Sequence, residues 1–316
     1  MFKLITMYKK TGDSLINVKD DFKSGFAALI GRTNVGKSTL LNTMVGRKVT
    51  IVSDKPQTTR NKILSVLTKD DSQVIFLDTP GFHKPKHRLG EHLVQVALRS
   101  LREVDVILFL VEAGQTPGPG DLFIMEQLKG IKTPVLLVIN KIDLVRREEQ
   151  LPLMEKYSKL YNFSEIIPVS ALTGDNVARL LDTVSGYLPL GPQYYPEGMV
   201  TDRPETFIMS ELVREKVLEL TSQEIPHSVA VVIEELTERP NGVVAVRALI
   251  YTERESQKGI LIGKDGSMLK RIGQLAREEM EKLLGSKIFL ELWVKVKADW
   301  RNREGQLQNF GYQGEE

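Results

Sequence analysis

The stretch GRTNVGKS, Gly31 to Ser38, constrains the fold of this chain more than any other. It follows an apolar run at residues 26–30 and leads into a helix-like stretch that Gly46 can end. A glycine-rich turn between a buried strand and a helix lets backbone N–H groups surround a phosphate at the helix N-terminus. Chance seldom places such a turn between a strand and a helix, so the pattern predicts a phosphate-binding loop.

Two side chains would complete this loop. The Lys37 ammonium would neutralise β- and γ-phosphate oxygens, and the Ser38 hydroxyl would bind Mg²⁺. The predicted nucleotide contacts of the loop are Gly31, Asn34, Val35, Gly36, Lys37, Ser38 and Thr39.

Further apolar runs alternate with helix-like stretches along the first part of the chain. They lie at residues 74–77, 106–111, 135–139 and 165–169. Strands so uniformly apolar are buried on both faces, and their alternation with helices predicts an α/β fold with a mostly parallel sheet and helices on both faces. Ligands of such sheets bind at the carboxyl ends of the strands.

The stretch DTPGFHKP begins where the strand at residues 74–77 ends. Asp78 would hold Mg²⁺ through its water shell, and the Gly81 N–H would bond the γ-phosphate of a nucleotide. Phe82 stands where Ras-like GTPases carry the glutamine that orients the attacking water, and it can form no hydrogen bond. Either the chain is not a hydrolase or another group positions the water.

A threonine is also required between the two loops, to close over the γ-phosphate and the metal. Thr58 and Thr59 are the candidates, in the polar stretch DKPQTTRNK. We favour Thr59, which together with Ser38 and Asp78 would form the metal site.

NKID, Asn140 to Asp143, follows the strand at residues 135–139. The Asp143 carboxylate can accept from both N1–H and the 2-amino group of guanine, a pair that adenine lacks. Asn140 would approach the O6/N7 edge of the purine, and the Lys141 stem would pack over the ring.

SAL, Ser170 to Leu172, follows the strand at residues 165–169. The Ala171 N–H can donate to guanine O6, which again rejects adenine. Alone, each motif is weak, but their order and their positions after strands predict GTP or GDP with Mg²⁺ as the ligand.

The pattern changes after residue 187, where a Pro- and Gly-rich stretch predicts a linker. A smaller α+β domain follows, with the order α-β-β-α-α-β and the loop GKDG between its last two helices. Two glycines there let an RNA backbone approach the loop closely; the alternative is a helix pair with incidental glycines. Ile260, Leu261 and Ile262 would line a groove for bases. The predicted RNA contacts are Ile260, Ile262, Gly263, Lys264, Asp265, Gly266, Lys270 and Arg271.

Composition restricts the class of protein. The chain has 316 residues, no cysteine and a net charge of +2, so disulfides and thiolate metal sites are excluded and a uniformly basic surface is not expected. Positive charge is concentrated at residues 258–303, with 11 basic and 6 acidic residues. No apolar run approaches the roughly 18 residues that span a bilayer. A soluble intracellular protein is therefore expected.

The motifs GRTNVGKST, KPQTTRN, DTPGFHKPKHRLG, NKID, VSAL and QKGILIGKDGSMLKRIG together resemble the bacterial ribosome-assembly GTPases of the Era family. The resemblance covers about residues 22–303 and implies a P-loop GTPase domain followed by a type II KH domain. It also implies binding near the 3′ end of small-subunit ribosomal RNA, action on the pre-small ribosomal subunit, slow intrinsic turnover, a monomer, and a fraction held loosely at the inner membrane surface.

The resemblance also bears on Phe82, because the wider group of these GTPases replaces the glutamine with a hydrophobic residue. An asparagine in their P-loop can help to hold K⁺ beside the phosphates, and Asn34 has the matching position here. The predicted catalytic residues are accordingly Lys37, Thr59, Gly81 and Asn34.

The expected domain boundaries are a flexible extension at residues 1–21, the GTPase domain at 22–187, a linker at 188–205, the KH domain at 206–303 and a disordered tail at 304–316. Three alternatives stay open. They are a tRNA-modification GTPase, disfavoured by the absence of cysteine; a tandem-GTPase ribosome factor, disfavoured by the single P-loop; and a non-hydrolysing, nucleotide-gated RNA chaperone.

Overall fold

A run of five parallel strands forms the centre of the N-terminal domain. The computed structural model describes residues 21–53, 55, 63–78, 101, 103–222 and 225–310. In it, the five predicted strands are present as β1 (Lys23–Gly31), β3 (Ser72–Asp78), β4 (Val106–Glu112), β5 (Val135–Asn140) and β6 (Glu165–Pro168). They lie in the order β3-β1-β4-β5-β6 and confirm the parallel α/β fold.

One strand of this sheet was not predicted. β2 (Ile63–Thr68) pairs antiparallel with β3 and forms the edge of the six-stranded sheet. An antiparallel edge strand on a parallel sheet is common, and its mixed apolar and polar residues give a weaker sequence signal than those of the buried strands.

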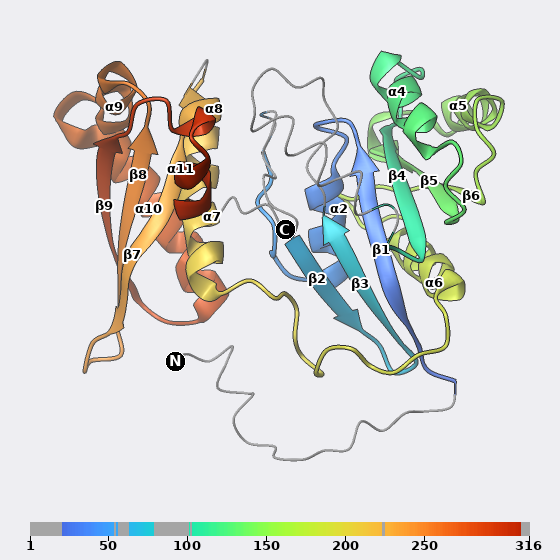
Figure 1. Cartoon of the computed structure of the whole chain (residues 1–316), viewed down its shortest axis with the longest axis horizontal. Helices are drawn as coiled ribbons and strands as arrows, with labels where there is room; N and C mark the ends of the chain where they lie inside the picture. Colours follow the sequence, from blue (N-terminus) through green and yellow to red (C-terminus); the bar gives the residue numbers. More distant parts are fainter. Residues whose placement is uncertain are drawn as a thin grey trace.

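Helices cover both faces of the sheet (Figure 1). α2 (Lys37–Val45) and α6 (Val177–Tyr187) pack on one face, and α4 (Pro119–Leu128) and α5 (Arg147–Ser158) on the other. Along β1 the side chains alternate between these two cores, because successive residues of a strand point to opposite faces. Ala27 and Leu29 pack with α2 and α6, whereas Ala28 and Ile30 pack with α4 and α5.

The predicted linker is hydrogen-bonded to the N-terminal domain along much of its length. The Gly191 N–H donates to the carbonyl of Phe22, and the Val66 N–H donates to the carbonyl of Val200. The connection therefore runs along the sheet before α7 (Glu205–Leu220) begins.

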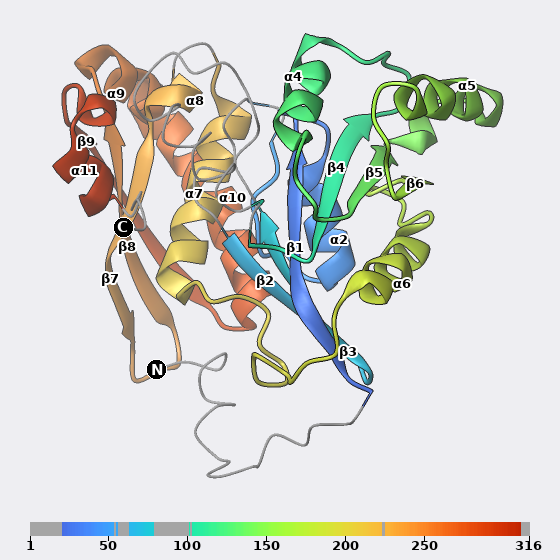
Figure 2. The same ribbon diagram turned by 45° about the vertical axis from the view of Figure 1, so that its right-hand side comes forward.

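The second domain has the predicted order α-β-β-α-α-β, with one short additional helix, α8 (Ile225–Ser228), after α7. Its other elements are β7 (Ala230–Glu238), β8 (Val244–Thr252), α9 (Glu255–Ile262), the 3₁₀ turn η2 (Lys264–Gly266), α10 (Ser267–Leu284) and β9 (Ile288–Val296). β7 and β8 are antiparallel, and β9 is parallel to β8. α7 and α10 pack on one face of this three-stranded sheet, the face turned toward the N-terminal domain (Figure 2).

The prediction of a disordered tail from residue 304 is wrong for its first part. η3 (Trp300–Asn302) and α11 (Glu304–Asn309) follow β9. Phe310 packs edge-on against Trp300, with ring centroids 5.2 Å apart, and lies 4.7 Å from the ring of Tyr251. This aromatic cluster packs against Ala230 of β7 and Tyr251 of β8, and burial of the rings favours an ordered helix there. Residues 311–316 and the N-terminal residues 1–20 lie outside the described residues.

Within the part of the chain that the structure describes, no helix combines the length and apolar character needed to span a bilayer.

Candidate nucleotide and nucleic-acid sites

The predicted nucleotide motifs meet at one edge of the first sheet. The P-loop follows β1, Asp78 ends β3 and Asn140 ends β5, while Ser170 comes two residues after β6. These strands are parallel, so their carboxyl ends lie side by side.

The P-loop backbone requires its second glycine. Gly36 has φ of 95° at the N-terminus of α2, and a Cβ there would lie 2.3 Å from the Asn140 side-chain nitrogen. Asn34 is exposed and also has a positive φ, 67°, which asparagine tolerates better than most residues. At Gly36 the P-loop backbone therefore lies closer to Asn140 than a residue with a side chain would permit.

Lys37 is buried in the loop, with 7% of its surface exposed. Its Nζ donates to the carbonyls of Gly31, at 3.1 Å, and Arg32, at 2.8 Å. Burial lowers the pKa of Lys37 to about 8, although the nearby Asp78 carboxylate acts to raise it. A desolvated ammonium at a helix N-terminus has the charge and the place that a bound phosphate needs.

Ser38 and Asp78 face each other at the same place. The Ser38 Oγ lies 3.4 Å from Asp78 Oδ2, and Asp78 is fully buried. Mg²⁺ prefers oxygen ligands and usually binds one or two protein groups together with water and phosphate oxygens, which this pair fits. Among the described residues, no group of three or more His, Cys, Asp or Glu side chains is arranged so that it could hold a metal ion. The predicted Thr59, its alternative Thr58, and Gly81 and Phe82 lie outside the described residues.

Asn140 connects the P-loop with the SAL loop. It is 1% exposed; its Nδ2 donates to the Val35 carbonyl at 2.8 Å, and its Oδ1 accepts from the Ala171 N–H at 2.9 Å. Both residues were predicted to contact the base. The structure instead shows the Ala171 N–H bonded to Asn140, and the remaining amide N–H of Asn140 is the one that a purine edge would use.

The Asp143 carboxylate, predicted to bind guanine, is held by a partner that the sequence did not reveal. The Ser170 Oγ donates to Asp143 Oδ1 at 2.5 Å, and it accepts from the Thr173 N–H. Lys141 has a positive φ of 66°, and its ammonium lies 3.1 Å from Glu112 at the end of β4. Asp143 is exposed, which leaves it accessible to a base, and Leu172, two residues after Ser170, is 78% exposed.

A second unpredicted contact fixes the P-loop to α4. Arg32 Nε donates to Asp121 Oδ1 at 2.8 Å, and its Nη2 donates to Gln115 Oε1. Asp121 is fully buried and also accepts from the Gly118 N–H. A Cβ on Gly120 would lie 2.7 Å from the Arg32 side chain. The glycine directly before Asp121 is therefore the sequence signal for this close packing.

The GKDG loop forms a tight, exposed turn between α9 and α10. Gly263 has φ of 71°, and a Cβ there would lie 2.9 Å from the Met268 backbone nitrogen. Gly266, with φ of 76°, is the N-cap residue directly before α10. Lys264 and Asp265 are exposed on the turn, as are Lys270 and Arg271 on the first turns of α10. The polar and charged members of the predicted RNA set are therefore gathered on one accessible end of the domain.

The predicted apolar groove needs one correction. Ile260 is 53% exposed, but Leu261 is fully buried in the core and Ile262 packs partly against that core. Successive residues of a helix point about 100° apart, so three in a row cannot face one groove. Ile260 is the exposed member.

Comparisons with known proteins agree with this geometry. A family model described as "50S ribosome-binding GTPase" matches residues 26–141, and a KH domain model matches residues 224–301. The chain is 57% identical over 293 residues to a GTPase Era of Heliobacterium modesticaldum, covering 93% of this chain and 98% of that one. It is 53% identical to a GTPase Era of Staphylococcus haemolyticus, covering 92% and 98%.

Two solved structures are similar over nearly the whole chain. One is Era in complex with MgGDPNP and nucleotides 1506–1542 of 16S ribosomal RNA, and the other is a single-residue variant of Aquifex aeolicus Era bound to GDP.AlF4⁻. Each is 43% identical, with a TM-score of 0.89, and the match covers 92% of this chain and 99% of the other.

Proposed function

The chain belongs to the Era family of GTPases and is a GTP hydrolase, and we propose that it binds small-subunit ribosomal RNA near its 3′ end during maturation of the small subunit. The observation that carries the proposal is the exposed turn at Gly263–Gly266, with Lys264 accessible, on a KH domain joined to a GTPase domain. A relative with 43% identity, solved with a segment of 16S ribosomal RNA, supports the choice of RNA.

The RNA contacts that we propose have two physical roles. Amides of the glycine turn and the Lys264 ammonium would face phosphates, whereas Ile260 offers an exposed apolar surface to a base. Lys270 and Arg271 would extend the positive surface along α10.

For the nucleotide, we propose Mg²⁺ held by Ser38 and, through water, by Asp78, with Thr59 added when the γ-phosphate is present. The metal would neutralise charge on the β- and γ-phosphates. Lys37 supplies a further positive charge from the P-loop, and the Asp143 carboxylate selects guanine. The facing hydroxyl and buried carboxylate support this assignment.

Phe82 cannot orient the attacking water, so we propose that backbone groups do so and that K⁺ beside Asn34 stabilises charge between the β- and γ-phosphates. The exposed, positive-φ position of Asn34 on the P-loop supports a role toward a ligand. GTP turnover is then faster in K⁺ than in Na⁺ at equal ionic strength, and Asn34→Ala removes the difference. Equal rates in the two salts would contradict the proposal.

The RNA proposal is tested by crosslinking in cells followed by sequencing of the bound RNA. Wild type is expected to give one discrete footprint near the 3′ end of the small-subunit RNA, which Lys264→Asp loses. Lys129→Asp, the same charge change on the exposed surface of the GTPase domain, is the matched control and keeps the footprint. An unchanged footprint in Lys264→Asp, or scatter over many RNAs, contradicts the proposal.

A cytoplasmic location, a fraction held loosely at the inner membrane surface, and a monomeric state are proposals that follow from the family resemblance. Cell fractionation and light scattering measure them.

A further inference from the structure

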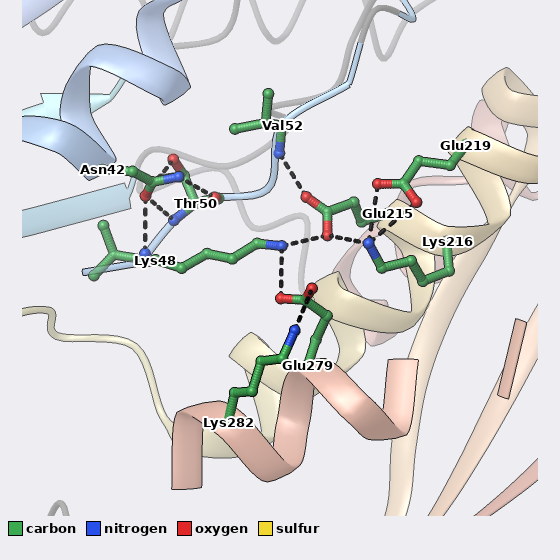
Figure 3. A network of polar contacts seen from close by, with 10 residues as sticks. Asn42, Lys48, Thr50, Val52, Glu215, Lys216, Glu219, Glu279 and Lys282 are labelled. Carbon is green, nitrogen blue, oxygen red and sulfur yellow. Dashed lines mark hydrogen bonds and ion pairs between the residues drawn. The ribbon is translucent and has the colours of Figure 1, made fainter. Parts of the chain in front are cut away.

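A lysine that follows the P-loop helix joins the GTPase domain to two helices of the KH domain. Lys48 Nζ lies 2.6 Å from Glu215 Oε2 on α7 and 3.3 Å from Glu279 Oε2 on α10 (Figure 3). The two carboxylates come from different helices of the KH domain, and both contact the Lys48 ammonium of the GTPase domain. Lys48 thus joins the two domains through ion pairs.

Glu215 contacts the GTPase domain through both of its oxygens. Its Oε1 accepts from the Val52 N–H at 2.9 Å, while Oε2 accepts from Lys48. Lys216, from the same helix, lies 3.2 Å from Oε2. The Glu215 side chain is only 2% exposed, and a buried carboxylate is costly unless its hydrogen bonds are made. Two of the three donors that satisfy it belong to the other domain.

On the GTPase side, the segment that carries these donors is fixed to the P-loop helix. Asn42 of α2 accepts from the N–H groups of Val49 and Thr50 and donates to the Thr50 carbonyl at 2.8 Å (Figure 3). The Thr50 hydroxyl lies 3.3 Å from the carbonyl of Ser38. Val52, whose N–H Glu215 accepts, is therefore two residues from Thr50, which is hydrogen-bonded to the backbone of Ser38, the proposed Mg²⁺ ligand.

The same segment leads directly into the stretch with the switch threonine. Val52 lies seven residues before the predicted Thr59 in the sequence. On the KH side, Glu279 belongs to α10, whose first residue, Ser267, follows the GKDG loop. The Lys48 ion pairs thus lie just before the stretch with the predicted switch threonine, and one of their two carboxylates, Glu279, lies on the helix that follows the GKDG loop.

We propose that Glu215 is a positioning residue for the GTPase switch, by which the KH domain itself holds residues 48–52 and thereby sets nucleotide affinity. A coupling free energy is reciprocal, so the same contact would transmit the nucleotide state to the RNA loop. The nucleotide part of the inference stands on GTP hydrolysis alone, while the RNA part rests on the proposed function.

The test compares full-length wild type with Glu215→Gln, which keeps the shape and an acceptor for the Val52 N–H but loses the charge that binds Lys48. Glu219→Gln is the control; Glu219 lies one turn further along α7 and pairs with Lys216. Release of a fluorescent GDP is expected to accelerate about fivefold in Glu215→Gln, the lower end of ordinary allosteric coupling, and to stay unchanged in the control.

Lys48→Met tests the same contact from the GTPase side and serves if Glu215→Gln folds poorly. The double variant Lys48→Met, Glu215→Gln is expected to release GDP no faster than the faster single variant, because both changes remove the same Lys48–Glu215 ion pair. Additive effects of the two changes would contradict a shared contact.

The RNA part is measured as the ratio of affinities for a synthetic 3′-end fragment of small-subunit RNA with GDP and with a non-hydrolysable GTP analogue. In wild type this ratio is expected to differ from one. It is expected to approach one in Glu215→Gln and to keep the wild-type value in Glu219→Gln. If GDP release and this ratio both stay at wild-type values in Glu215→Gln, the contact only docks the domains and the inference is wrong. If wild type binds the fragment in neither state, the proposed function fails while the GDP measurement still decides the role of Glu215.

Discussion

The hydroxyl of Ser170 donates a hydrogen bond to the carboxylate of Asp143, although 27 residues separate them in the chain. The carboxylate that we expect to bind N1–H and the 2-amino group of guanine is therefore oriented before the base arrives. We predict that Ser170→Ala weakens GDP binding about fivefold, from loss of a hydrogen bond of about 1 kcal/mol. Fluorescent GDP titration measures the effect. ADP binding should stay negligible, because the carboxylate that we propose to select guanine is still present. An unchanged GDP affinity would show that Asp143 needs no support from Ser170.

Asn140 gives a prediction that separates a structural role from contact with the base. Its amide joins the Val35 carbonyl and the Ala171 N–H inside the protein. Asn140→Ala leaves both groups buried without this partner, so we expect a loss of about 2 kcal/mol in the free energy of unfolding without nucleotide. Denaturant unfolding of the nucleotide-free protein measures it. A residue that acted only on the base would lower nucleotide affinity and leave this free energy unchanged.

In the proposed roles of the DTPGF loop, Asp78 binds the metal through water, whereas Phe82 forms no hydrogen bond. We predict that Phe82→Ala binds GTP as wild type does, because an apolar side chain next to Gly81 supplies no hydrogen bond to the nucleotide. Asp78→Asn is expected to raise the Mg²⁺ concentration needed for half-maximal turnover about tenfold, as loss of an outer-sphere carboxylate does at other metal sites. Mg²⁺ titrations of phosphate release check both. Loss of GTP binding in Phe82→Ala would contradict the role assigned to the loop.

The positions of the nucleotide motifs could be predicted from the sequence because each follows a continuous apolar strand, and parallel strands end at a common edge. Their supporting contacts could not. Ser170 with Asp143, and Glu215 with Lys48, are polar pairs separated by 27 and 167 residues, and no periodicity marks them. Leu261 was misassigned for a different reason, since its apolar character alone does not tell a groove residue from a core residue.

The C-terminal helix shows the same limit, and it gives a fourth prediction. Phe310 lies in a polar stretch with few aromatic residues, so the packing of its ring depends on the Tyr251 and Trp300 rings, which only the fold brings to it. We predict that Phe310→Ala lowers the free energy of unfolding of the KH domain by about 1–2 kcal/mol, from lost apolar burial. Trp fluorescence should report it through Trp300. Gln308→Ala, on the same helix, is the control and should have little effect.

Protonation of Glu279 is expected to weaken the contact between the two domains at low pH. Burial acts to raise the pKa of Glu279, but Lys48, together with Lys216 and Lys282, holds it below the ordinary value of 4.5. A carboxyl with a lowered folded-state pKa stabilises the protein fully above its unfolded-state pKa, and this stabilisation is lost as the pH falls through the folded-state value. The difference in melting temperature between wild type and Glu279→Gln should therefore be constant above about pH 5 and shrink toward zero at lower pH. In a Lys48→Met background the difference above about pH 5 should be smaller, because the main partner of the Glu279 carboxylate is gone. A difference that grows on acidification would contradict this account of the pair.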